Sequence, residues 1–350
     1  MLCLFVGSTG NRAGQSLVTW ALACDLRARG LRVSFLKPLF PSQEGFDPSH
    51  GDPDGMLFKQ VLDLPEPMER ICPVMESWEP YGRSSAEDLA EQLRPLLEER
   101  SSQVDVLLVM GSPKVFLDEP SLPASDISLA QALGAGFLLV SRHLDLPRTV
   151  YSVLSVRSLL GAGLKAVVLN RVGPHQVDEV WSAMRQRLGK RAMPPIMIVP
   201  EDPLLSSLTL AQVVEAAGGE FLLGQERAQE LVSGWSMGAS QLLSGELAVF
   251  KRVYNRVVLM GAQEPGQQTA PRPVGVLLTS GRRPPPVLFE VARRIDLPLV
   301  LVAQDTFSTL DRLERYLPSL TPMEAVKARR MVEFLGLGGK LKELRSSLGI

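Results

Sequence analysis

The sequence predicts an α/β protein in which a doubly wound, parallel-sheet, P-loop-like domain is followed by a smaller α/β domain and a C-terminal helical tail. Two observations carry this prediction. Short apolar runs typical of buried parallel strands alternate with helical segments up to about residue 203, and a second strand–helix–strand unit follows over residues 274–302. At 350 residues the chain is long enough for about two domains.

The composition argues against several classes of function. The net charge of −1 argues against broad electrostatic binding to nucleic acid or to an anionic membrane. No apolar run approaches the roughly 18 residues of a membrane span, and Met1 leads directly into a strand. The 3 cysteines lack CxxC spacing and the 3 histidines are widely separated, so we expect reduced thiols and no zinc site. These observations predict a cytoplasmic protein without nucleic-acid or membrane partners.

The first strand runs into a glycine-bounded loop. Residues 1–6 are apolar, residues 7–14 form the loop, and Gln15 and Ser16 open a helix that continues to about Arg29. This order is the frame of a phosphate-binding loop, because backbone N–H groups and the helix dipole converge on one anion. An ordinary strand, turn and helix without a ligand is the alternative. The candidate nucleotide-binding residues of this loop are Gly10, Asn11, Arg12, Ala13, Gly14, Gln15 and Ser16.

The loop lacks its usual lysine. Gln15 stands where a lysine would neutralise phosphates, whereas Ser16 keeps the hydroxyl that holds magnesium. An amide can donate a hydrogen bond to a phosphate oxygen but carries no charge. We therefore expect binding to persist and efficient phosphoryl transfer to be lost.

Three further residues near other strand ends are candidates for the binding site. Lys37 ends a strand over residues 31–38 and is either a source of positive charge in the crevice or a solvated strand end. Asp54 precedes a helix over residues 56–62. It either caps this helix or, together with Ser16, faces a metal ion. Asn170 follows the strand 166–169 and either reads a purine edge or forms a turn.

Met110 ends a central strand over residues 104–110, where a nucleotide-hydrolysing protein would place an acidic magnesium ligand. A thioether is a poor ligand for a hard cation, so we interpret Met110 as core packing. Asp126 is expected to cap the next helix, which ends near Gly134.

The chain continues with regularly spaced elements. Composition shifts at residues 205–209, where Thr209 is expected to cap a helix over 210–217. The amphipathic segment 322–346 is expected to pack on its own domain or on a dimer partner. Further strands are predicted over 137–140, 196–199, 274–279 and 299–302, and further helices over 84–100, 147–160, 176–188, 287–295 and 308–316. The resulting domains are 1–203, 206–317 and the tail 318–350.

Taken together, these residues resemble a known arrangement. The first domain is similar to the dethiobiotin-synthetase-like domain of long bacterial phosphotransacetylases, and the second to the DRTGG domain that follows it there. The matching segments of the first domain are 8–16, 35–38, Asp54, 71–74, 128–130, 169–172 and 200–205. Those of the second are 208–209, 218–219, 280–281, 297–298 and 305–307.

The resemblance implies roles for these positions. In dethiobiotin synthetase a loop lysine grips phosphates, a Lys-Pro lysine holds the substrate carbamate, and an Asn reads adenine. Asp and Glu side chains join the loop hydroxyl around magnesium. By position this chain keeps Lys37, Asn170, Ser16 and Asp54, but has Gln15 for the loop lysine and Met110 for the Glu. The segment 257–263 also lacks the acidic and basic pair of the DRTGG signature.

These departures predict a non-catalytic regulatory or scaffold protein. We expect it to bind ATP or ADP with Mg²⁺ weakly, to form a homodimer through the DRTGG-like domain, and to serve an unidentified protein partner. No acetyltransferase domain is expected, because the sequence stops at Ile350. One alternative is an ATP-dependent ligase of the dethiobiotin or cobyrinate type in which Lys37 replaces the loop lysine. Another is a pure protein-interaction module with a vestigial pocket.

Overall fold

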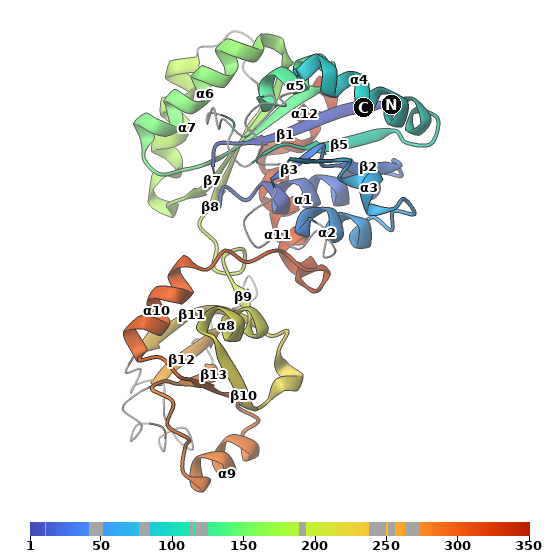
Figure 1. Cartoon of the computed structure of the whole chain (residues 1–350). Coiled ribbons are helices and arrows are strands. Elements are labelled where there is room, and N and C mark those ends of the chain that lie inside the picture. Colours follow the sequence, from blue (N-terminus) through green and yellow to red (C-terminus); the bar gives the residue numbers. More distant parts are fainter. Residues whose placement is uncertain are drawn as a thin grey trace. The chain divides into compact units, whose positions relative to one another are not determined.

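The computed structural model describes residues 1–10, 12–41, 52–76, 85–112, 115, 125–188, 194–237, 250, 256–262 and 273–350. They form two compact units (Figure 1). The first unit combines Met1–Glu201 with Ser319–Ile350, and the second is Asp202–Pro318. In sequence, the second unit is therefore an insertion into the first.

The first unit contains a six-stranded parallel sheet in the order β2-β5-β1-β6-β7-β8. The chain leaves β1 toward β2 and leaves β5 toward β6, in the opposite direction, so the winding reverses between β1 and β5. Ligands of open α/β sheets bind at such a switch point. The doubly wound prediction is confirmed. The strands are β1 (Leu2–Ser8), β2 (Val33–Leu36), β5 (Val106–Met110), β6 (Gly136–Arg142), β7 (Leu164–Val172) and β8 (Ile196–Pro200).

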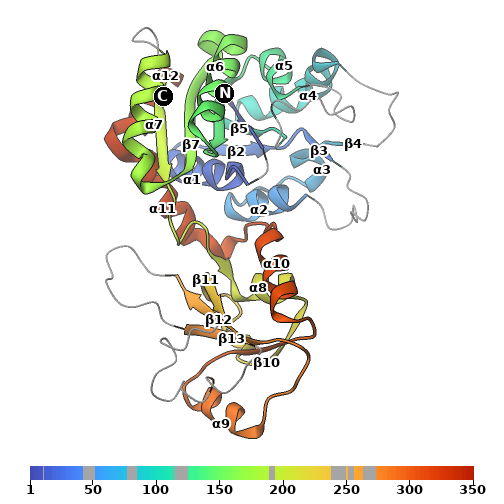
Figure 2. The same cartoon turned by 90° about the vertical axis from the view of Figure 1, so that its left-hand side faces the viewer.

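Helices cover both faces of this sheet. One face forms a buried core in which Phe5 stacks on Phe137 amid side chains of four helices. Those helices are α4 (Ala86–Ser101), α5 (Asp126–Ala132), α6 (Leu146–Leu160) and α7 (Val177–Leu188). The other face carries α1 (Gln15–Arg27), α11 (Ala325–Gly336) and α12 (Lys340–Leu348), of which α11 contacts α1 and β8 and α12 contacts β7 (Figure 2). Near β2 lie α2 (Pro53–Val61) and α3 (Met68–Ile71), and a two-stranded sheet pairs β3 (Leu39–Pro41) with β4 (Val74–Glu76).

The C-terminal helices complete the first unit. Side chains alternate across a strand, so Val168 and Met197 face away from the core that includes Val167 and Ile196, yet they are buried. Met331 and Leu335 of α11 are buried as well, and Arg345 of α12 forms an ion pair with Asp25 of α1. The sequence set residues 318–350 apart as a tail; the structure groups Ser319–Ile350 with the first unit, because their apolar faces cover β7, β8 and α1.

The second unit is built on a mixed six-stranded sheet in the order β10-β14-β13-β12-β11-β9. The predicted strand–helix–strand unit is present, since β13 and β14 are parallel and α9 connects them. Thr209 caps α8, as the sequence predicts, and the structure shows that it does so in a capping box with Gln212. The elements are β9 (Leu208–Thr209), α8 (Leu210–Ala217), β10 (Gly219–Leu223), β11 (Leu231–Met237), β12 (Arg256–Gly261), β13 (Pro273–Leu278), α9 (Pro286–Arg294), β14 (Leu299–Val302) and α10 (Thr306–Arg315).

Two expected helix caps were wrong. Helix α2 starts at Pro53 and is capped by Asp52, whose carboxylate accepts the Gly55 N–H at 2.9 Å, so Asp54 lies in the first turn. Helix α5 is capped by Ser125, and Asp126 is its first residue. In both cases a residue one or two positions earlier also suits the N-cap, and the helix begins earlier than the sequence pattern suggests.

None of the helices formed by the described residues is long and apolar enough to cross a membrane. The thiols of Cys3, Cys24 and Cys72 are free. Burial raises the pKa of Cys3 and of Cys72 to about 12, which keeps both as neutral thiols.

The packing of α11 predicts that alanine substitutions at two methionines differ in their effect on the free energy of unfolding. Met331→Ala removes a side chain that is 0% exposed and should lower the free energy of unfolding of the first unit by about 2–5 kcal/mol. Met323→Ala, at a position 68% exposed, is the matched control and should change it little. Hydrogen exchange of amides in α1 and β8 measures the loss. Equal protection in the two variants would contradict the assignment of α11 to this core.

Candidate functional site

The predicted phosphate-binding loop connects β1 to α1. Gly14 precedes the helix in the left-handed region, at φ 89°. A Cβ atom there would lie 2.3 Å from the Asn170 side-chain nitrogen, so only glycine fits. Having no side chain, Gly14 offers no capping bond to the first turn of α1. Helix α1 therefore begins after a glycine, as the helix of a phosphate-binding loop does.

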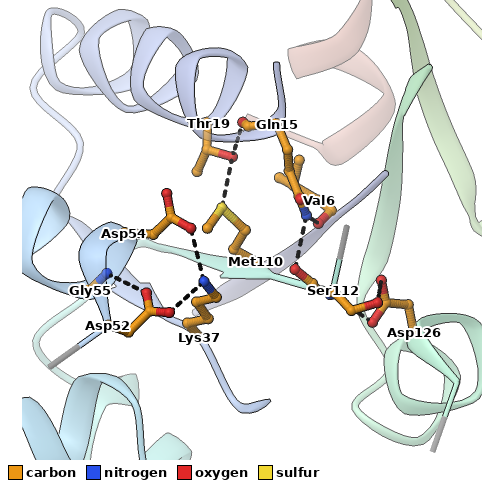
Figure 3. Close-up of polar contacts among 11 residues, drawn as sticks. Val6, Gln15, Thr19, Lys37, Asp52, Asp54, Gly55, Met110, Ser112 and Asp126 are labelled. Atoms are coloured by element: carbon orange, nitrogen blue, oxygen red, sulfur yellow. Dashed lines mark hydrogen bonds and ion pairs between the residues drawn. The ribbon is translucent and has the colours of Figure 1, made fainter. Parts of the chain in front are cut away.

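Gln15 turns inward at the switch point (Figure 3). Its Nε2 donates to the carbonyl oxygen of Val6 at 2.8 Å and to that of Gly111 at 3.0 Å. Val6 lies in β1 and Gly111 follows β5, so one amide joins the two strand ends between which the winding reverses. Both hydrogens of this amide are used within the protein. The expected hydrogen bond from Gln15 to a phosphate would require breaking one of these contacts.

Met110 occupies the buried end of β5, only 1% exposed. Its Sδ lies 3.9 Å from the hydroxyl of Thr19, which donates mainly to the Gln15 carbonyl at 2.8 Å (Figure 3). This placement agrees with the interpretation of Met110 as core packing.

Lys37 is buried between two carboxylates. Its Nζ lies 2.7 Å from Asp52 Oδ2 and 2.8 Å from Asp54 Oδ2 (Figure 3). Burial alone lowers the pKa of Lys37, but the charges and hydrogen bonds of Asp54 and Asp52 outweigh it and raise the pKa above its usual value. Lys37 is therefore fully charged, and its charge is balanced by its neighbours.

Asn170 clamps the loop. Its Nδ2 donates to the carbonyl oxygen of Ala13 at 2.8 Å, and its Oδ1 accepts the N–H of Arg171 at 2.9 Å. The side chain is buried, and this geometry uses it to hold the loop against β7. The same amide would have to release the loop before it could read adenine.

The other predicted residues lie along the same edge. Gly10 closes a small turn in which its carbonyl accepts the Ser8 hydroxyl at 3.0 Å. Arg12 is exposed and has φ 63°, and Ser16 is partly buried in the first turn of α1. Asn11 lies outside the described residues.

These residues fit a magnesium nucleotide poorly. Magnesium requires several oxygen ligands, but Asp54 is paired with Lys37 and β5 ends in a thioether. In the described part of the chain, no group of three or more His, Cys, Asp or Glu side chains is placed to hold a metal ion. The glycine that precedes α1 is kept, whereas Lys37 is already paired with Asp52 and Asp54.

Sequence reasoning did not foresee the environment of Asp126. Its carboxylate accepts the Ser112 N–H at 3.0 Å and lies 3.4 Å from the Ser112 hydroxyl, just after β5 (Figure 3). A Cβ atom on Gly111 would lie 2.4 Å from Asp126 Oδ2, which explains the glycine. Burial raises the pKa of Asp126 from 3.8 to about 7, although the Ser112 hydrogen bonds lower it. No sequence signal distinguishes this aspartate from an ordinary cap.

Comparison with known proteins places the chain in a family. Over 187 residues it is 30% identical to an ATP-dependent dethiobiotin synthetase from Anaeromyxobacter sp., a match that covers 48% of this chain and 76% of that protein. The chain belongs to the dethiobiotin synthetase family. This family member also carries a DRTGG domain, matched over residues 212–316.

Two further relatives span nearly the whole chain. It is 23% identical over 351 residues to a phosphate acetyltransferase from Synechocystis sp., covering 94% of this chain and 49% of that protein. It is 28% identical over 340 residues to one from Deinococcus radiodurans, covering 89% and 46%. The chain thus spans about half the length of these two relatives. The predicted pairing of a dethiobiotin-synthetase-like domain with a DRTGG domain is confirmed.

The Asp126 environment predicts a pH-dependent stability. The folded protein holds a proton on this carboxyl up to pH about 7, whereas the unfolded chain releases it near pH 4. The folded state therefore binds more protons between these values, so the free energy of unfolding falls as pH rises, by at most about 1.4 kcal/mol per pH unit. Asp126→Asn should flatten this slope in urea titrations at pH 4 to 8.

The matched control is Asp63→Asn, at an exposed position, which should keep the wild-type slope. An Asp126→Asn variant with the same pH dependence as the wild type would show that the carboxyl is ionised when folded.

Proposed function

We propose that this dethiobiotin synthetase family member is a non-catalytic regulatory or scaffold protein with a degenerate nucleotide-binding loop. One observation carries the proposal: polar side chains that the family directs at nucleotide or substrate are engaged with the protein itself. Gln15 bonds two strand carbonyls, Lys37 is paired with two aspartates, and Asn170 holds the loop.

The rate effects that such substitutions usually have favour a loss of catalysis over a small reduction in rate. Removing one preorganised group that stabilises transition-state charge typically costs about 10²- to 10³-fold in rate. This chain lacks two such groups, since Gln15 and Met110 are neutral. If the two losses were independent, the rate would fall at least about 10⁴-fold.

Weak nucleotide binding remains part of the proposal. Helix α1 begins after Gly14, which offers no side-chain cap, and Ser16 lies in its first turn, so an anion could accept from backbone N–H groups there. ATP or ADP would bind there with little charge from the loop itself, and Mg²⁺ would contribute through Ser16 and Asp54 only if Asp54 released Lys37.

The test combines turnover with binding. The protein should hydrolyse ATP at least about 10⁴-fold more slowly than a dethiobiotin synthetase assayed in parallel, because two charged groups are missing. Calorimetry with ATP and ADP, with and without Mg²⁺, should give weak binding that changes little with the metal. Mutation-sensitive turnover near the rate of the reference enzyme would overturn the proposal. Absence of any nucleotide binding would instead favour a pure protein-interaction module.

An ATP-dependent ligase of the dethiobiotin or cobyrinate type is the second candidate. Family membership and the charged Lys37 at the crevice favour it. In that case Lys37 would leave its aspartates to replace the loop lysine. Steady ATP hydrolysis that Lys37→Ala abolishes and Lys59→Ala leaves unchanged would support the ligase.

We also propose that the protein is cytoplasmic and forms a homodimer through the second unit. Free cysteines fit a reducing compartment. Large apolar side chains on α9 and α10 are exposed, among them Val287 and, at 75%, Phe307.

A dimer predicts a mass of twice 38.2 kDa by light scattering. Phe307→Ser should shift the mass toward one chain, because it removes exposed apolar surface from the second unit. Leu159→Ser, at a position 58% exposed on α6 of the first unit, is the control and should leave the dimer intact. A monomeric wild type would refute the dimer without bearing on the loop.

A further inference from the structure

The peptide group between Gly111 and Ser112, just after β5, is hydrogen-bonded on both sides (Figure 3). Its carbonyl oxygen accepts from Gln15 Nε2 at 3.0 Å, and its N–H donates to Asp126 Oδ1 at 3.0 Å. The side chains of Gln15, Ser112 and Asp126 are all buried. One peptide group thus connects a buried carboxyl group on α5 to the amide side chain at the start of α1.

Neighbouring atoms hold this peptide group in place. A Cβ atom on Gly111 would lie 2.4 Å from Asp126 Oδ2 and 2.5 Å from Cε1 of Phe5, so the carboxyl group and the core enclose the glycine. Gln15 Nε2 also donates to the Val6 carbonyl oxygen at 2.8 Å, which fixes the other end of the connection. A change at Asp126 therefore reaches Gln15 through a peptide group that has little room to move aside.

Asp126 is the member of this connection that can change its charge. Burial raises the pKa of Asp126 to about 7, against an opposing effect of the Ser112 hydrogen bonds, and no charged group is among the causes of this shift. The elements packed against α5, which are β1, α4 and α6, do carry other ionisable side chains. They are Cys3 on β1; Glu87, Asp88, Glu91, Arg94, Glu98, Glu99 and Arg100 on α4; and Arg148, Tyr151 and Arg157 on α6.

We infer that Asp126 is a proton switch that regulates the loop, because its ionisation tightens the hold on Gln15 through the Gly111–Ser112 peptide group. An ionised carboxylate accepts a shorter and stronger hydrogen bond than a neutral carboxyl group does. Hydrogen bonds in a chain polarise one another, so a stronger bond at the Ser112 N–H makes the Gly111 carbonyl oxygen a better acceptor for Gln15. This inference rests on the proposed function in one respect: the regulated loop is the one proposed to bind nucleotide weakly.

The direction of the effect follows from the contacts of Gln15. To donate to an anion, its amide has to leave the carbonyl oxygen of Gly111 or of Val6. Ionisation of Asp126 strengthens the contact with Gly111 and places a negative charge on the other side of the same peptide group. Both effects oppose an anion, so the loop should accept one more readily when Asp126 is protonated.

The experiment follows Gln15 directly by NMR. Protein labelled with ¹⁵N in glutamine is titrated from pH 5 to 9, and Gln15→Met assigns the signal of the Gln15 side-chain amide. We expect this signal to shift with a midpoint near pH 7, to which burial raises the pKa of Asp126, and the ¹³C signal of the Asp126 carboxyl to share that midpoint. The buried Gln212 side chain, which accepts the Thr209 N–H at 2.9 Å in the second unit, is the control in the same sample and should not shift.

Two variants separate Asp126 from other titrating groups. Asp126→Asn keeps an acceptor for the Ser112 N–H but cannot ionise, so its Gln15 signal should not depend on pH. Asp63→Asn, at an exposed position, should behave like the wild type. Calorimetry with ADP at pH 6 and pH 8 gives a second readout. The wild type should lose more affinity between these values than Asp126→Asn does, by at most about tenfold per pH unit for one linked proton.

The outcomes separate this inference from the proposed function. A Gln15 signal that stays constant while Asp126 titrates, or that shifts equally in Asp126→Asn, overturns the switch, and so does an Asp126 carboxyl that titrates below about pH 5. Equal pH dependence of ADP affinity in the wild type and Asp126→Asn overturns its regulatory effect on the loop. If Asp126→Asn does not fold, the shared midpoint of Asp126 and Gln15 in the wild type, against a constant Gln212, decides. ATP turnover overturns the non-catalytic proposal but leaves the switch standing.

Discussion

The amide of Gln15 ties together the two strands between which the sheet reverses its winding. Each of its hydrogens meets a main-chain carbonyl, one after β5 and one in β1. Buried carbonyls at strand ends need donors, and here a neutral side chain supplies them where the family has a lysine. A lysine at this position serves a ligand, whereas the glutamine serves the fold.

Lys37, the lysine that remains in the site, is also held by groups of the protein itself. The Lys37 ammonium lies between the carboxylates of Asp52 and Asp54. It provides the positive charge that a metal cation would otherwise have to provide there. Breaking such a buried pair is costly, typically about 3–5 kcal/mol, because it leaves an uncompensated charge. Recruiting Lys37 to a phosphate requires the ligand to offset that cost, because buried Asp52 would lose its partner.

The sequence was sufficient for the features that depend on local pattern. The alternation of apolar runs and helices gave the doubly wound sheet, and the loss of charge at Gln15 and Met110 was visible directly. Contacts between distant residues were not predictable. Gln15 bonds a carbonyl 96 positions away, and Asn170 bonds one 157 positions away. An amphipathic pattern likewise shows that α11 has an apolar face but not which surface it covers, so residues 319–350 could not be assigned to the first unit.

The second unit is inserted in sequence between β8 and the C-terminal helices of the first unit. Glu201, the counter-charge of Arg171, bonds through its N–H to the Val172 carbonyl at 2.8 Å and is the last residue before the second unit begins. Glu201 also raises the pKa of Arg171, which burial lowers, so this residue is tied to the end of β7 both through its backbone and through its charge. The first unit therefore fixes the residue from which the second unit starts, and the helices that follow the second unit in sequence cover β7, β8 and α1 of the first.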